Sequence, residues 1–174
     1  MPIRRFMQLD VFAPAPGAGN PLAVMFDAGG LDEARMQAFA AWTNLSETIF
    51  FLPPTTAEAD YRIRIFTPRM ELPFAGHPSV GAAWAAVEAG LARPRAGRLV
   101  QECAAGLLPV RADQVDDRLQ PSVRSPRAHE RTLAAPDWML GEHVFGARRG
   151  PLEPALWNNG PDWWLLELAD AAAV

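Results

Sequence analysis

The chain has 174 residues, a formal net charge of −4 and 49% hydrophobic residues. This length fits one domain or two small ones, and the hydrophobic share is enough for a buried core. Because the chain has no basic excess, nucleic acid is not expected as its main partner. All 16 basic residues are arginine, which excludes Schiff-base chemistry and a phosphate-loop lysine on this chain.

The cysteine and histidine content excludes further kinds of site. The single cysteine, Cys103, cannot form a disulfide within the chain or supply both thiols of a two-cysteine racemase. The three histidines, His77, His129 and His143, are too far apart for an HExxH type of metal motif. The longest apolar run, Val80 to Ala92, is shorter than the roughly 20 residues of a membrane-spanning helix. We therefore expect a cytoplasmic protein that has no metal and no membrane partner.

The first half of the chain alternates strand and helix patterns. A turn-rich segment, 13–21, separates two apolar runs, and a Gly-Gly pair precedes a run with helical spacing. Tyr61 to Phe66 alternates apolar and basic residues with the period of a half-buried strand. In chain order, the patterns predict strands at Ile3 to Phe12 and Leu22 to Phe26, a helix at Leu31 to Trp42, and strands at Glu47 to Leu52 and Tyr61 to Phe66.

The second half is less regular. An alanine-rich helix opens at Pro78 and Ser79 and ends at Gly90, and Leu99 to Val110 predicts a hairpin bent at Ala105-Gly106. The pattern then weakens until Trp157 to Leu168, where a turn precedes an expected buried strand from Trp163. The order of elements favours an α+β fold, divided into residues 1–113 and 114–174.

The stretch from Glu71 to Gly81 is the first that suggests chemistry. The first turn of a helix presents unpaired N–H groups and the positive end of the helix dipole, and Gly76 lets a ligand approach the backbone. These features predict a site for a carboxylate or a developing enolate, with His77 beside it to orient the substrate or move a proton. The alternative is purely structural: Ser79 is the N-cap, Pro78 lies near the first helical position and His77 is a solvated loop residue.

Glu47 is the second candidate, because this carboxylate stands at the start of the apolar run Ile49 to Leu52. A partly desolvated glutamate can serve as both acid and base. The alternative is a glutamate at a strand end that is exposed or hydrogen bonded to backbone N–H groups.

Five segments in one order resemble the PhzF-type phenazine-biosynthesis isomerase family. Each segment is weak evidence alone, but their order and spacing over residues 8–81 are specific. The segments are Leu9-Asp10-Val11-Phe12, Gly19-Asn20-Pro21-Leu22-Ala23-Val24, Ser46-Glu47-Thr48, Ile63-Arg64-Ile65-Phe66-Thr67-Pro68 and Glu71-Leu72-Pro73-Phe74-Ala75-Gly76-His77-Pro78.

The resemblance implies a diaminopimelate-epimerase-like fold, in which a curved, mostly antiparallel sheet surrounds a central helix in each of two halves. It also implies a cofactor-free isomerase that moves a proton on a small carboxylate-bearing substrate such as trans-2,3-dihydro-3-hydroxyanthranilate. Glu47 matches the catalytic acid and base of the family, and His77 joins it in the catalytic pair. The residues that the resemblance assigns to substrate binding are Asn20, Ser46, Gly76, Pro78 and Ser79.

Two departures qualify this resemblance. Related epimerases and proline racemases have a cysteine where this chain has Ala75, so carboxylate-based isomerisation fits better than two-thiol exchange. Members of the family also continue well beyond residue 174, and the acidic group and the anion-binding segment of their second half are not found here. We therefore expect an incomplete second half and a homodimer that covers exposed apolar faces. Two alternatives stay open: a catalytically silent carboxylate-binding or assembly module, and an α+β domain whose motifs are structural remnants.

Overall fold

The structure is a computed structural model that describes residues 3–132 and 149–173. It forms two compact units that divide the chain after Pro126. The predicted division after residue 113 falls inside a strand of the first unit, Gly106–Val115. The organisation into two epimerase-like domains stays a prediction, and each unit is described separately.

The first unit is built on an eight-stranded, mostly antiparallel sheet. Two of its described pairings are parallel, Asn20–Met25 with Glu47–Leu52 and Tyr61–Phe66 with Arg98–Cys103, and the others are antiparallel. In spatial order the strands are β1 (Phe6–Val11), β2 (Asn20–Met25), β3 (Glu47–Leu52), β4 (Tyr61–Phe66), β6 (Arg98–Cys103), β7 (Gly106–Val115) and β8 (Arg118–Val123), with β5 (Glu71–Leu72) added to β4.

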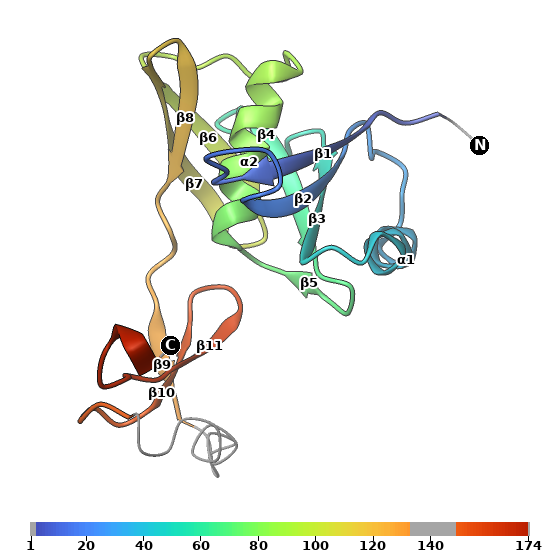
Figure 1. The fold of residues 1–174 in the computed structure, drawn as a ribbon. Coiled ribbons are helices and arrows are strands. Elements are labelled where there is room, and N and C mark those ends of the chain that lie inside the picture. The colour runs from blue at the N-terminus through green and yellow to red at the C-terminus, as the bar shows by residue number, and fades with distance from the viewer. Residues whose placement is uncertain (1–2, 133–148, 174) are drawn as a thin grey trace. The chain divides into compact units, whose positions relative to one another are not determined.

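The sheet curls around one helix, α2 (Gly76–Glu88), which packs against β1, β2, β3, β4, β6 and β8 (Figure 1). The other helix, α1 (Glu33–Thr43), packs against β3 and β4 from the opposite face. Asp32 caps its N-terminus by accepting a hydrogen bond from the Arg35 N–H at 2.8 Å. This arrangement confirms the predicted α+β half-barrel around a central helix.

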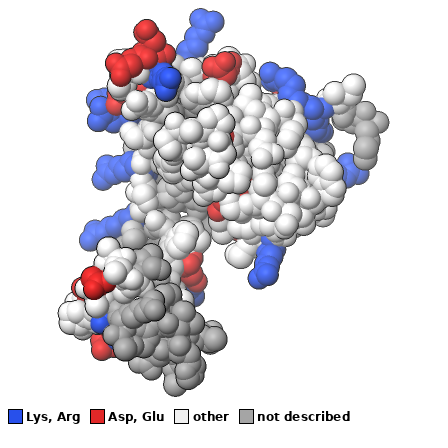
Figure 2. All heavy atoms as spheres, viewed as in Figure 1, with Lys and Arg blue, Asp and Glu red and all other residues white. Residues whose placement is uncertain are grey.

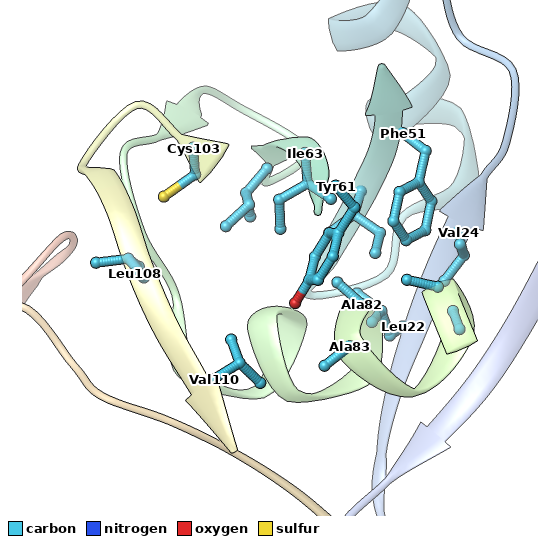
Figure 3. Close-up of a cluster of buried hydrophobic side chains, with 14 of the residues drawn as sticks. Leu22, Val24, Phe51, Tyr61, Ile63, Ala82, Ala83, Cys103, Leu108 and Val110 are labelled. Carbon is cyan, nitrogen blue, oxygen red and sulfur yellow. The ribbon is translucent and has the colours of Figure 1, made fainter. Parts of the chain in front are cut away.

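The core of the half-barrel lies between the inner face of the sheet and α2. Its strand residues are large and apolar, whereas α2 contributes mainly small residues that let its backbone approach the strands (Figure 3). The alanines that do so, Ala82, Ala83, Ala85 and Ala86, are all fully buried. A second cluster, which includes Met36, Phe50 and Phe66, joins α1 to the outer face.

The half-barrel is open between its two edge strands, β1 and β8. A hollow of about 550 Å³ lies there, and Leu9, Val11, Trp84 and Leu119 are among the residues that line it. In the view of Figure 2, the arginine and acidic side chains of the first unit lie mainly around its rim, and the middle of that face is uncharged.

Several sequence-based expectations need correction in the first unit. The pattern weakens after residue 113 and predicts no strand there, yet Arg118–Val123 pairs with β7 and ends the sheet. Its residues alternate strictly between exposed and half-buried, as in a strand with one face toward solvent. Arg64, one of the basic residues that alternate along β4, is half-buried: its guanidinium donates to Glu71 through Nε and Nη2, and Nη2 also donates to Glu33 at 2.8 Å.

The second unit contains an antiparallel sheet of β9 (His129–Arg131), β10 (Ala155–Asn158) and β11 (Asp162–Leu165), followed by a short 3₁₀ helix, Ala171–Ala173. The predicted turn between β10 and β11 is confirmed. The expected buried strand from Trp163 to Leu168 is wrong in extent and burial, because β11 ends at Leu165 and all its residues are exposed. None of the helices in the described ranges is long and apolar enough to cross a membrane.

The packing of α2 generates the first prediction. A Cβ added at Gly81 would lie 2.5 Å from the Leu22 Cδ2 and 2.9 Å from the Val11 Cγ2, whereas one added at Gly76 would meet no atom within 4 Å. We expect Gly81→Ala to lower the free energy of unfolding by about 1–3 kcal/mol, because the extra methyl overpacks the contact. Urea denaturation measures the difference.

Gly76→Ala is the matched control in the same helix. It should leave the unfolding free energy unchanged or raise it by about 0.4–1 kcal/mol, because alanine restricts the unfolded chain. Equal stability of the two variants would contradict the close approach at Gly81.

Candidate functional site

The candidate site begins at the first turn of α2. Ala75 is the N-cap residue, in extended conformation, and no side chain caps the helix. The alternative in which Ser79 serves as the N-cap is therefore wrong: Ser79 lies inside the first turns of the helix. Gly76 is exposed, and there is open space where its Cβ would be. The first-turn N–H groups are thus available to an anion that approaches over Gly76.

Glu47 and His77, the second residue of α2, form a close pair. Glu47 is the first residue of β3, and its Oε2 lies 3.4 Å from the His77 Nε2. Only 16% of the Glu47 side chain and 10% of the His77 side chain are exposed. Neither of the two facing atoms has a hydrogen-bond partner of good geometry. A buried carboxylate and imidazole that face each other in this way are unfavourable for stability and suited to proton transfer.

Asn20 and Ser46 extend this pair toward the surface. The Asn20 Nδ2 lies 3.3 Å from the His77 Nδ1, and the Ser46 hydroxyl donates to the Asn20 Oδ1 at 3.1 Å. Asn20 opens β2, and Ser46 directly precedes β3. Since β2 and β3 are parallel, with Leu22 opposite Glu47, their first residues lie at the same edge of the sheet.

Burial controls the charge of His77. Desolvation lowers the pKa of the imidazole below its ordinary value, and this effect outweighs the attraction of Glu47 and the interaction with the backbone of Pro21, which both raise it. His77 is therefore neutral at neutral pH, with one ring nitrogen able to donate and the other able to accept.

A second polar chain holds the first turn of α2 from inside the core. The Tyr61 hydroxyl donates to the Gln101 Oε1 at 3.3 Å, and the Gln101 Nε2 donates to the Ser79 hydroxyl at 3.0 Å. Ser79 in turn donates to the Ala75 carbonyl at 2.8 Å. Figure 3 shows the Tyr61 ring directed toward α2. This buried chain anchors the residue from which the helix begins.

The structure thus separates the predicted site residues into two groups. Asn20, Ser46, Glu47 and His77 lie together at the end of α2 where Gly76 is exposed. Pro78 and Ser79 are buried instead, and the Ser79 hydroxyl is already used by Ala75 and Gln101.

Sequence reasoning missed Tyr61 and Gln101, although they support the site. A glutamine at an inward position of an apolar strand is the signal that could have found Gln101, which is fully buried.

Comparison with known proteins supports the family resemblance independently of the structure. The model of a family described as "Phenazine biosynthesis-like protein" matches residues 9–174. The chain is 40% identical, over 97% of its length and 59% of the relative, to "Antisense-enhancing sequence 1" of Schizosaccharomyces pombe. It is 36% identical, over 99% of its length and 60% of the relative, to trans-2,3-dihydro-3-hydroxyanthranilate isomerase of Pseudomonas aeruginosa.

Solved structures show the same fold. A structure described as a predicted epimerase from Pseudomonas aeruginosa superposes with a TM-score of 0.77 at 33% identity, covering 98% of this chain and 61% of that one. A probable proline racemase from Agrobacterium radiobacter superposes with a TM-score of 0.67 at 15% identity, covering 94% of this chain and 52% of that one, which shows the shared fold alone. The chain spans about three fifths of the length of the curated relatives given above.

The buried chain through Ser79 generates the second prediction. We expect Ser79→Ala to lower the free energy of unfolding by about 1–3 kcal/mol, because it leaves the Gln101 amide without its acceptor in the core. Urea denaturation of the variant beside Ser122→Ala, an exposed serine on β8, isolates the effect of burial. If both variants are as stable as the unsubstituted protein, the hydrogen bonds through Ser79 do not anchor α2.

The lowered pKa of His77 generates the third prediction. The unfolded chain takes up a proton on this histidine near pH 6.5, and the folded chain does so only at lower pH, so the unfolded state binds more protons between these values. The free energy of unfolding should therefore fall as the pH falls through this window.

His77→Gln should flatten this pH dependence, measured as the slope of unfolding free energy between about pH 7.5 and pH 5. His129→Gln, which changes an exposed histidine of the second unit, should leave the slope unchanged. A slope that survives His77→Gln would show that another group causes it.

Proposed function

Because this chain belongs to the phenazine biosynthesis-like (PhzC-PhzF) family, we propose that it is a cofactor-independent isomerase that moves a proton on a small carboxylate-bearing substrate. The observation that carries the proposal is the pair of Glu47 and His77, whose facing atoms are buried, beside the exposed, uncapped start of α2. A relative with 36% identity is named trans-2,3-dihydro-3-hydroxyanthranilate isomerase, which makes that compound the first substrate to test.

The start of α2 is suited to hold the substrate carboxylate. The N–H groups of its first turn and the helix dipole attract an anion, and the missing Cβ of Gly76 leaves room for it. A carboxylate bound there places the adjacent carbon atoms of the substrate near Glu47, since His77 belongs to the same turn and contacts Glu47.

In this proposal Glu47 is the catalytic acid and base. Its carboxylate removes a proton from one carbon of the substrate, and the resulting carboxylic acid returns a proton to another carbon, so one group serves both steps. His77, which is neutral and buried, orients Glu47 and interacts with charge that develops on the substrate.

The other predicted residues have distinct places in this proposal. Asn20 and Ser46 lie at the exposed rim, where they can contact substrate. Pro78 and Ser79 are buried, so we propose that they act by shaping and anchoring the first turn of α2. A homodimer and a cytoplasmic location stay predictions.

Glu47→Gln generates the fourth prediction. We expect it to reduce isomerisation of trans-2,3-dihydro-3-hydroxyanthranilate roughly 10²–10⁴-fold, because the amide cannot accept and return the proton. The measurement uses the full chain in D₂O and monitors the incorporation of deuterium from solvent into the substrate by proton NMR.

Glu88→Gln, an exposed change at the far end of α2, is the charge-matched control and should keep full activity. Retained exchange in Glu47→Gln would refute the acid and base role. Binding of the compound by the unsubstituted chain without any exchange would refute the isomerase proposal for this chain and favour the carboxylate-binding module.

A further inference from the structure

We propose that Ser46 and Asn20 are positioning residues that hold His77 in a single tautomer, with its proton on Nε2 and directed at Glu47. The role of this tautomer in catalysis rests on the proposed function, whereas the tautomer itself can be measured without substrate. The proposal rests on four groups that contact one another in a row: the Ser46 hydroxyl, the Asn20 amide, the His77 imidazole and the Glu47 carboxylate.

Among these four groups, the Glu47 carboxylate determines which nitrogen of His77 carries the proton. The Glu47 Oε2 and the His77 Nε2 lie 3.4 Å apart, and both atoms are buried. An ionised carboxylate can only accept hydrogen bonds. If Nε2 were unprotonated, two lone pairs would face each other in a region that excludes water, so the proton is favoured on Nε2.

The proton on Nε2 leaves Nδ1 as an acceptor. Asn20 faces Nδ1 with its Nδ2 at 3.3 Å, which is the amide atom that can donate. An amide can rotate and present its oxygen instead, so a further contact is needed to fix it. The Ser46 hydroxyl supplies that contact by donating to the Asn20 Oδ1 at 3.1 Å.

Every donor in this arrangement points the same way. Ser46 donates to Asn20, Asn20 donates to His77, and Nε2–H of His77 is directed at Glu47. The reverse order would place the proton on Nδ1 and require a proton on Glu47 to satisfy Nε2. The Ser46–Asn20 pair therefore favours the arrangement in which Nε2–H of His77 is directed at the Glu47 carboxylate.

Asn20→Asp tests whether residue 20 controls the proton at Nδ1 of His77. The new carboxylate facing Nδ1 accepts but cannot donate, so it should draw a second proton onto the ring and raise the pKa of His77 by roughly 1–3 units. Glu47 and the backbone of Pro21 are the other groups that raise this pKa, and both are unchanged in the variant.

The measurement is long-range ¹H–¹⁵N NMR of the free, full chain, which distinguishes the two neutral tautomers and the charged ring and follows them with pH. The chain has only three histidines, so His77→Gln assigns the signal. In the unsubstituted chain we expect Nε2–H at neutral pH. Gln8→Glu, which adds the same charge at an exposed position of β1, should leave the tautomer and the pKa of His77 in place.

Ser46→Ala and Ser46→Thr give a second arm that does not depend on Asn20→Asp folding. Ser46→Ala should populate both tautomers because the amide is free to rotate, and Ser46→Thr should restore the single tautomer. A proton on Nδ1 in the unsubstituted chain, or a tautomer that is the same in Ser46→Ala, would overturn the proposal. An Nε2–H tautomer in a chain that shows no solvent exchange into substrate would uphold this proposal and refute only the isomerase function.

Discussion

The candidate site depends on the close approach of α2 to β1 and β2 at Gly81. A Cβ there would overlap side chains of both strands, so the helix lies as near to the sheet as a glycine permits. His77 is four residues earlier, one turn away on the same side of the helix. The contact that seats Gly81 on the sheet therefore also carries His77 to Asn20 and Glu47, and a wider separation of helix and sheet would break both interactions.

The parallel pairing of β2 and β3 is the second constraint. β3 is apolar after Glu47 and Thr48 because both of its faces are covered, by α2 on one side and α1 on the other, and β2 is buried from Leu22 onward. The polar residues of these two strands stand at their beginnings. Since parallel strands begin at the same edge, Asn20 and Glu47 lie at one place, and the start of α2 meets them there.

The sequence predicted much of this arrangement because local signals coincide with it. Glu47–Leu52 and Tyr61–Phe66 were predicted with the bounds that the structure shows, since turns border them and their patterns are unambiguous. The start of α2 was placed at Pro78 rather than Gly76, because no side-chain cap marks it. The strand Arg118–Val123 was missed although its residues alternate, because the prolines and charged residues of the surrounding segment obscure that period. Similarly, nothing local to Gln101 or Tyr61 indicates that their side chains meet Ser79.

Two polar chains end on the first turn of α2, and they differ in a way that bears on function. The chain through Tyr61, Gln101 and Ser79 is buried and closed, because each of its hydrogen bonds ends on a partner, the last being the Ala75 carbonyl. The chain through Ser46, Asn20 and His77 is open, because it reaches Glu47 without forming a good hydrogen bond. The closed set of hydrogen bonds fixes the backbone at Ala75. The open set leaves the Glu47 carboxylate 3.4 Å from the His77 Nε2, without a strong hydrogen bond, and so able to accept a substrate proton. The hydrogen bonds at Ala75 hold the start of α2 in place, and so they also hold His77 at this distance from Glu47.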